Sequence, residues 1–183
     1  MGLVDGDPQA GEQAACELAR AGGRVVAMEA DVSSADQVAD AVRAIEAKFG
    51  PISILVNAAG GGDQADPRYH PPEPGLDLIG ILLLTRAVLP SMQNARWGRI
   101  VSVLPEQASE TGDGPLSAAA RAAAASFCQT LAIQAAHWNV TVNTIASGGE
   151  EATGTIVASI AADDAAGITG QTLRPSFGIT QLV

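Results

Sequence analysis

The 183 residues are 47% hydrophobic and only 16% charged, a composition typical of one folded domain with an apolar core. Lys and Arg number 10 against 20 Asp and Glu, which gives a net charge of −10. Because phosphate backbones and anionic lipid surfaces require clustered Lys and Arg, this balance argues against nucleic acid and against a membrane surface as partners.

The two cysteines indicate neither a metal site nor a disulfide framework. Cys16 and Cys128 lie in separate alanine-rich stretches, without CxxC spacing or a histidine cluster. We therefore expect two reduced, buried thiols in a cytoplasmic protein. The first residues lack the basic and apolar regions of a secretory signal. The longest apolar run, 76–90, contains Asp77 and Arg86 and is expected to be too short to span a bilayer.

Strand-like and helix-like segments alternate at intervals of roughly 20 to 30 residues, the pattern of a parallel sheet covered by helices on both faces. The strand runs show little polar alternation, as expected for strands buried on both faces. No internal repeat or interdomain linker interrupts the pattern, so residues 1–183 are expected to form a single domain. The expected strands are 3–4, 24–28, 54–57, 99–103, 141–145 and 172–173, and the expected helices are 8–21, 34–49, 76–94, 117–137 and 155–161.

Local signals mark the ends of these helices. Asp7 before Pro8 predicts an N-cap followed by proline at the first helical position, and Gly22 predicts the end of that helix. Ser34 is expected to cap the second helix. Gly50, followed by a proline, is expected to end it and turn the chain into the next strand.

Five runs of sequence carry a family resemblance over essentially the whole chain. They are ILVNAAG from Ile54, GILLLTRAVLPSM, GRIVSV, SAAARAAAASFCQTLAIQAA and VTVNTIASG. In order and spacing they resemble the short-chain dehydrogenase/reductase family. The resemblance implies a Rossmann-like, doubly wound parallel α/β sheet of about six strands. It also implies an N-terminally truncated member that lacks the family's first strand and glycine-rich turn.

A rival alignment of the first residues stays open. It takes Leu3 to Asp5 as the family's first strand and Gly6 to Gly11 as a degenerate glycine turn, with the second strand and its helix deleted. The segment GDPQAG does follow a strand and open a helix. Against it, Pro8 and Gln9 occupy the turn and the third glycine is absent.

Several positions match the family's nucleotide pocket. The resemblance implies cofactor contacts at Asp5, Asp31, Val32, Asn57, Ala58, Ala59 and Gly60. A structural interpretation competes with this one, because Asn57 could tie neighbouring strands together and Asp31 could cap a turn. Since the glycine turn supplies backbone amides to the pyrophosphate, its loss predicts that NAD(P) binding is weak or absent.

The family's catalytic positions carry unsuitable residues. By alignment, Ser117 stands at the tyrosine position, Arg121 at the lysine, Pro105 at the serine and Asp77 at the asparagine. A serine hydroxyl is too weak an acid to replace an activated phenol, and arginine resists the pKa tuning available to lysine. We therefore expect no catalytic residues for hydride transfer.

A different constellation could occupy the same cleft. Tyr69, His70, Asp77 and Glu106 fall in segments that lead to the carboxyl edge of the sheet, where α/β proteins bind ligands. A histidine near carboxylates could serve elimination, hydration or cyclisation. The interpretation that these four residues are solvated loop residues is favoured, because no triad or metal-binding spacing accompanies them.

Helices 76–94 and 117–137 resemble the pair through which family members dimerise. Small residues on the second helix permit close backbone approach: Ala118, Ala119, Ala122, Ala123 and Ala125. The first hypothesis is thus a non-catalytic subunit that associates, as a dimer or tetramer, with a homologous full-length dehydrogenase/reductase or with itself. The alternatives are a homo-oligomeric enzyme for a redox-neutral step and a binding or scaffold protein.

The absent first strand also predicts a rearranged sheet. In the family order 3-2-1-4-5-6-7, that strand lies between the strands assigned here to residues 3–4 and 54–57. We expect strand 3–4 to move against strand 54–57, giving the order 3-2-4-5-6-7 and closing the cofactor cleft, because unpaired edges are costly. Otherwise a partner must donate a strand, or the first 50 residues are loosely held.

Overall fold

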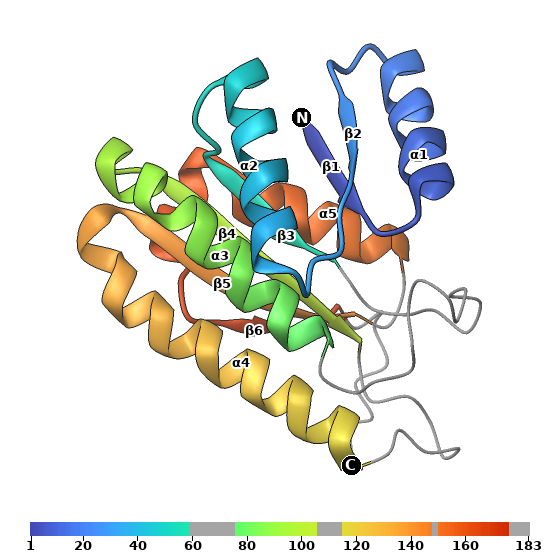
Figure 1. Cartoon of the computed structure of the whole chain (residues 1–183). Coiled ribbons are helices and arrows are strands. Elements are labelled where there is room, and N and C mark those ends of the chain that lie inside the picture. The colour runs from blue at the N-terminus through green and yellow to red at the C-terminus, as the bar shows by residue number, and fades with distance from the viewer. Residues whose placement is uncertain (59–75, 106–114, 148–149, 176–183) are drawn as a thin grey trace.

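A computed structural model of the chain describes residues 1–58, 76–105, 115–147 and 150–175 (Figure 1). Strands and helices alternate over these residues, as the sequence predicts. The strands are β1 Gly2–Asp5, β2 Val26–Glu29, β3 Ile54–Asn57, β4 Gly98–Pro105, β5 Val140–Ser147 and β6 Thr172–Leu173. The helices are α1 Pro8–Arg20, α2 Ala35–Phe49, α3 Leu76–Ala95, α4 Pro115–Ala135 and α5 Glu150–Ala161, with 3-10 turns at Ala136–Trp138 and Asp163–Gly167.

The strands form two parallel sheets. One contains β1 and β2, with Gly2 opposite Val26 and Asp5 opposite Glu29. The other has the order β3-β4-β5-β6, and its long central pair runs in register from Gly98 opposite Val140 to Pro105 opposite Ser147. The predicted Rossmann-like α/β class with about six strands is therefore confirmed.

Most element boundaries differ from the expected ones by one or two residues, and the start of the last helix differs by five. The second strand begins at Val26 rather than at residue 24, because Gly22 and Gly23 fold back on α1, where Gly22 has φ +91° and Gly23 N–H bonds the Leu18 carbonyl. The last helix begins at Glu150 rather than at residue 155. Strands 54–57 and 172–173 lie where the sequence places them.

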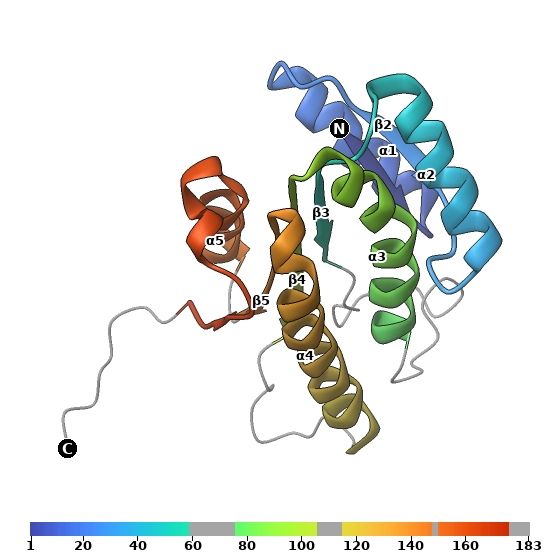
Figure 2. The same cartoon turned by 90° about the vertical axis from the view of Figure 1, so that its left-hand side faces the viewer.

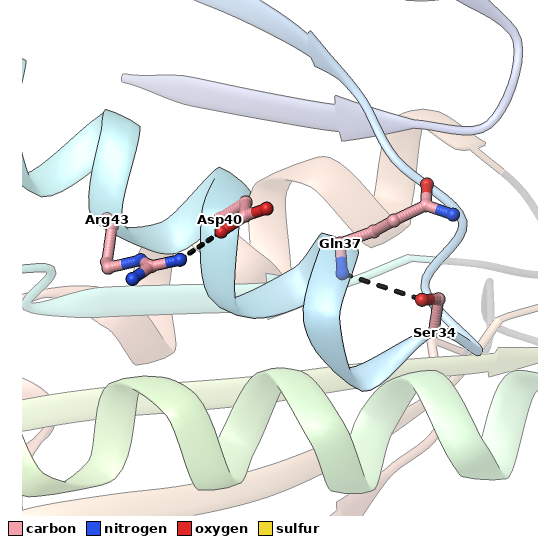
Figure 3. A network of polar contacts seen from close by, with 4 residues as sticks. All are labelled: Ser34, Gln37, Asp40 and Arg43. Carbon is pink, nitrogen blue, oxygen red and sulfur yellow. Dashed lines mark hydrogen bonds and ion pairs between the residues drawn. The ribbon is translucent and has the colours of Figure 1, made fainter.

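The predicted helix caps are present. The Asp7 carboxylate accepts hydrogen bonds from the backbone N–H groups of Gln9 at 2.8 Å and Ala10 at 3.3 Å, and Pro8 is the first helical residue. Ser34 Oγ accepts from the Gln37 N–H at 3.5 Å at the start of α2, where Asp40 and Arg43 form an exposed ion pair one turn further on (Figure 3). Gly50 ends α2 with φ +87°, a conformation that favours glycine.

Helices cover the two faces of the strands unequally. On one face α2, α3 and α4 lie side by side (Figure 2). They enclose the larger apolar core, which includes Val42, Val88, Ile100, Leu131 and Val142. On the other face α5 covers β4 and β5 through a smaller cluster of Val101, Ile145 and Ile160, and α1 covers β1 and β2, with Gly11 packed against Asp5 and Ala27.

The expected repair of the sheet is wrong. Strand β1 pairs with β2 and not with β3, and the four-stranded sheet begins at β3. The reason lies in the helices, since β1 is held by close contacts on both faces. Gly2 fits so tightly against Ile45 of α2 that a Cβ there would lie 2.4 Å from Ile45 Cδ1, while α1 packs on the opposite face.

Two further expectations need correction. Cys16 is exposed on α1, whereas Cys128 is buried as predicted. The apolar third helix extends to Ala95, so its segment Leu78–Ala95 is long and apolar enough to cross a membrane by length and composition alone. In this fold α3 lies between α2 and α4, and Ile81, Val88 and Met92 on it contribute to the larger core.

Replacing the cap residue of α1 tests this local structure. The Asp7→Ala variant should lower the free energy of unfolding by about 1 kcal/mol, because the Gln9 and Ala10 N–H groups lose their acceptor. Asp7→Asn is the matched control and should retain most of that stability. Urea denaturation followed by circular dichroism measures both, and an unchanged Asp7→Ala midpoint would contradict the capping role.

Candidate functional site

The predicted cofactor residues lie where strands of the two sheets end. Asp5 ends β1, Asp31 follows β2 by two residues, and Asn57 ends β3. In parallel α/β sheets this carboxyl edge is where ligands bind. The catalytic positions implied by the resemblance lie on neighbouring elements: Pro105 ends β4, Asp77 lies in the first turn of α3, and Ser117 and Arg121 lie in the first two turns of α4.

Asp5 and Asp7 shape the turn between β1 and α1. The half-buried Asp5 accepts a hydrogen bond from the Asp7 N–H at 2.8 Å through Oδ1. Asp7 in turn bonds the Gln9 and Ala10 N–H groups. These are the amides that a helix N-terminus would otherwise offer to an anion such as a pyrophosphate. A carboxylate already fills that position, and its charge would repel a phosphate.

The pairing of β1 and the turn that follows it can be compared with what the alternative alignment of the first residues requires. If β1 were the family's first strand and GDPQAG its phosphate turn, β1 should pair with β3 and the turn should present free amides. Instead β1 pairs only with β2 among the described strands, and Asp7 caps the helix. Neither the pairing of β1 nor the capped helix is what the alternative alignment requires.

Asp31 lies in an exposed turn between β2 and α2. Its Oδ1 accepts hydrogen bonds from the Ser33 hydroxyl at 2.6 Å and the Ser33 N–H at 2.8 Å. These two bonds, the hydroxyl first, hold the pKa of the Asp31 carboxyl below its ordinary value, against a small opposing effect of burial. The neighbouring Val32 packs on Gly80 of α3, where a Cβ would lie 2.9 Å from Val32 Cγ2.

Asn57 belongs to a buried polar group that connects β3, β4 and α4. Its Nδ2 donates to Ser102 Oγ at 3.2 Å, directly across the register of the two strands, and Cys128 Sγ contacts the same oxygen at 3.5 Å. Asn57 Oδ1 is buried without a hydrogen-bond partner in the described part of the chain. The contact to Ser102 is the strand tie that the structural interpretation of Asn57 expects.

Sequence reasoning missed Ser102 and Cys128 as members of this group. The available signal was spacing: Ser102 is the fifth residue of β4 and, in a parallel register, lies opposite the last residue of β3. Cys128 occurs in an apolar helix, and its sequence context gave no indication of a polar neighbour.

Ala58 is exposed at the end of β3. Ala59, Gly60, Tyr69, His70 and Glu106 lie outside the described residues. Over residues 1–58, 76–105, 115–147 and 150–175, no group of three or more His, Cys, Asp or Glu is arranged to hold a metal ion.

The described residues do not fit the phosphates of a dinucleotide. Helix α1, which follows β1, has its Gln9 and Ala10 amides bonded to Asp7, and no described strand pairs with both β1 and β3. Asp5 and Asp31 are engaged with the backbone of their own turns.

The parallel sheets and the helices that cover them define a Rossmann-like α/β protein. The sequence profile of the short chain dehydrogenase family matches residues 1–163. The chain belongs to this short chain dehydrogenase family.

Curated relatives support the assignment. The chain is 31% identical over 145 residues to a 3-oxoacyl-[acyl-carrier-protein] reductase of Synechocystis sp., a match that covers 76% of this chain and 59% of the relative. It is 34% identical over 145 residues to the D-beta-hydroxybutyrate dehydrogenase of Cupriavidus necator, covering 75% and 56%. The chain thus spans rather more than half the length of these relatives.

A solved structure shares the fold. NAD+-bound xylitol dehydrogenase superposes with a TM-score of 0.80 at 21% identity, covering 97% of this chain and 88% of that one. At this identity the likeness concerns the fold alone.

Substitution of Ser33 tests the electrostatics of the Asp31 turn. Ser33→Ala should raise the Asp31 pKa toward its ordinary value, because the hydroxyl bond is the largest cause of the lowering. The lowered pKa means that ionised Asp31 stabilises the fold above the unfolded-state pKa, and that this contribution is lost as pH falls through the folded-state pKa. Carbon-detected NMR titration of the Asp31 carboxyl measures the shift. Ser33→Thr, which keeps a hydroxyl, should titrate like the parent.

Proposed function

We propose that this chain is a non-catalytic subunit that associates with, and stabilises, a homologous full-length dehydrogenase/reductase. The observation that carries the proposal is at the start of α4, where Ser117 and Arg121 lie one turn apart at the positions of the family's tyrosine and lysine. A serine hydroxyl cannot replace the tyrosine phenol, and an arginine cannot replace the lysine. General acid and base contributions are worth about a hundredfold to ten-thousandfold each, so losing both leaves little hydride transfer.

The other catalytic positions support the same proposal. Pro105, at the serine position, has neither a hydroxyl nor a backbone N–H and ends β4 opposite Ser147. Asp77, at the asparagine position, brings a carboxylate in place of a neutral amide. The expected loss of the family's glycine-rich turn adds to this deficit, because that turn would supply backbone amides to the pyrophosphate. Weak or absent NAD(P) binding by the chain alone is part of the proposal.

Exposed apolar side chains on α3 and α4 support association with another subunit. Ile79 and Leu82 of α3 are exposed, and Ile133 of α4 keeps 81% of its surface accessible. A shallow pocket between α3 and the end of α4 is lined by Leu89, Gln93, Leu131, Ile133, Gln134, His137 and Trp138. Ala119, Ala122 and Ala123 are also exposed, which permits close helix approach. Apolar surfaces of this kind mark interaction sites.

Co-purification tests the proposal directly. The tagged chain, expressed in its native source, should retain a homologous full-length dehydrogenase/reductase identified by mass spectrometry. Ile133→Asp should reduce the recovered partner at least tenfold, because a charge in an apolar interface is left unpaired. Leu18→Asp, an equally drastic change at an exposed leucine of α1, is the control and should leave recovery unchanged.

Recovery of the chain only with itself, or only with unrelated proteins, would contradict the proposal. A partner retained equally by the Ile133→Asp and Leu18→Asp variants would place the contact elsewhere than α4.

Restoring two catalytic residues should not restore catalysis. The double variant Ser117→Tyr with Arg121→Lys is expected to leave NADPH unoxidised in the presence of a generic ketone, because Pro105 and Asp77 remain and the phosphate site is expected to be missing. Absorbance of NADPH over time measures turnover, and calorimetry of NADPH with the parent chain measures binding. Robust turnover by the double variant, or a low-micromolar dissociation constant for the parent, would contradict the assignment as a non-catalytic chain.

A further inference from the structure

A row of polar side chains crosses the larger apolar core. Asn57 of β3 lies opposite Ser102 of β4, and Ser102 lies opposite Thr144 of β5. In parallel strands, residues directly opposite each other direct their side chains to the same face of the sheet. All three side chains are buried, at 4%, 0% and 1% exposure. The register therefore places three polar groups side by side within the core.

The row lies on the face of the sheet that α3 and α4 cover. Two residues earlier on the same strands are Leu55, Ile100 and Val142, which form or contact the larger apolar core. Because side chains alternate along a strand, residues two apart share a face. Cys128 of α4 contacts Ser102 on this face, with 3.5 Å between the sulfur and the hydroxyl oxygen. The row is thus enclosed between the sheet and the helices.

Thr85 of α3 adds a buried hydroxyl at the same level. It is 2% exposed and lies seven residues before Met92 on the core face of the helix. A Cβ at Gly98 would lie 2.6 Å from the Met92 sulfur, so Met92 is level with the first residue of β4. Helix α3 connects two parallel strands and runs back along them, and seven helical residues span about 10 Å, as do three to four residues of a strand. Thr85 is therefore level with Ser102, four residues after Gly98.

Three oxygens at this level have no hydrogen-bond partner among the described residues. They are Asn57 Oδ1, Thr85 Oγ1 and Thr144 Oγ1, and each is buried. The Asn57 carboxamide is bonded only through Nδ2, which donates to Ser102 Oγ at 3.2 Å. A threonine in a helix can bond the carbonyl three or four residues earlier, but Thr85 makes no such bond. Buried polar groups that no protein group satisfies are usually bonded to ordered water.

We propose that this polar layer, formed by Asn57, Thr85, Ser102 and Thr144, is a binding site for internal water. The water donates to Asn57 Oδ1 and bonds the hydroxyls of Thr85 and Thr144. A buried water makes about three hydrogen bonds, and hydroxyls that both donate and accept can supply them. Both ends of the Asn57 carboxamide are then engaged within the core. The site lies inside one chain, so it does not depend on the partner proposed above.

Replacing threonine by its isostere valine gives opposite results for a hydrated and for an unpartnered hydroxyl. With water bound, Thr85→Val and Thr144→Val each remove a partner of that water and should lower the folding equilibrium constant about tenfold. Removal of an unpartnered hydroxyl should raise that constant instead, because its desolvation no longer opposes folding. Urea denaturation of the full chain measures the constant. Thr130→Val, at an exposed threonine of α4, is the matched control and should change it less than twofold.

The water itself is detected by oxygen-17 magnetic relaxation dispersion of the folded chain. This measurement responds to water molecules that stay bound for longer than nanoseconds, and it is insensitive to exchange of hydroxyl protons. The parent and Thr130→Val should show the same dispersion. Thr85→Val and Thr144→Val should each show a smaller one.

Stability and dispersion should fall together in both core variants. A variant that is as stable as the parent or more stable, or that keeps the full dispersion, would show that the hydroxyl at its position holds no water and would overturn the inference. The parent chain provides a second test that needs no variant to fold. Absence of a dispersion from the parent would mean that the layer is dry.

Discussion

The arrangement of this molecule depends on the packing of α2 across two separate sheets. Ile45 of α2 packs so closely on Gly2 of β1 that a Cβ at Gly2 would clash with it. On the same helix, Val38 and Val42 belong to the core against which Leu55 of β3 packs. The Glu46 carboxylate also anchors α2, because it accepts hydrogen bonds from the Ile52 N–H at 3.2 Å and from the Ser91 hydroxyl of α3 at 2.9 Å. With α2 fixed in this way, β1 is held beside β2 and α1, and its other edge stays open toward β3.

Much of the fold could be predicted because local signals and tertiary structure agree. Asp7, Pro8, Ser34 and Gly50 mark helix ends through their own backbone and side-chain chemistry, and the structure places the helix ends there. The buried strands are apolar without alternation, which is the pattern of a parallel sheet covered on both faces. Ile54 and Val56 share this pattern and yet are exposed. An apolar sequence shows that a strand is suited to burial, but it does not show whether another element covers that strand.

The errors arose where long-range packing outweighed a local rule. The cost of an unpaired edge suggested that β1 should move against β3, but moving it would break its contacts with α1, β2 and Ile45 together. An alanine-rich helix suggested that Cys16 is buried, but α1 packs through Gly11 and leaves the thiol outside. In the candidate site the identities of Asp5, Asp31 and Asn57 were visible, but their engagement with Asp7, Ser33 and Ser102 depends on turn geometry and strand register.

The open strand edges also bear on how the chain fares at high concentration. An exposed edge flanked by apolar side chains is a template for self-pairing, and Ile54 and Val56 lie beside one here. A high concentration of the chain therefore favours pairing between exposed edges, and with it aggregation.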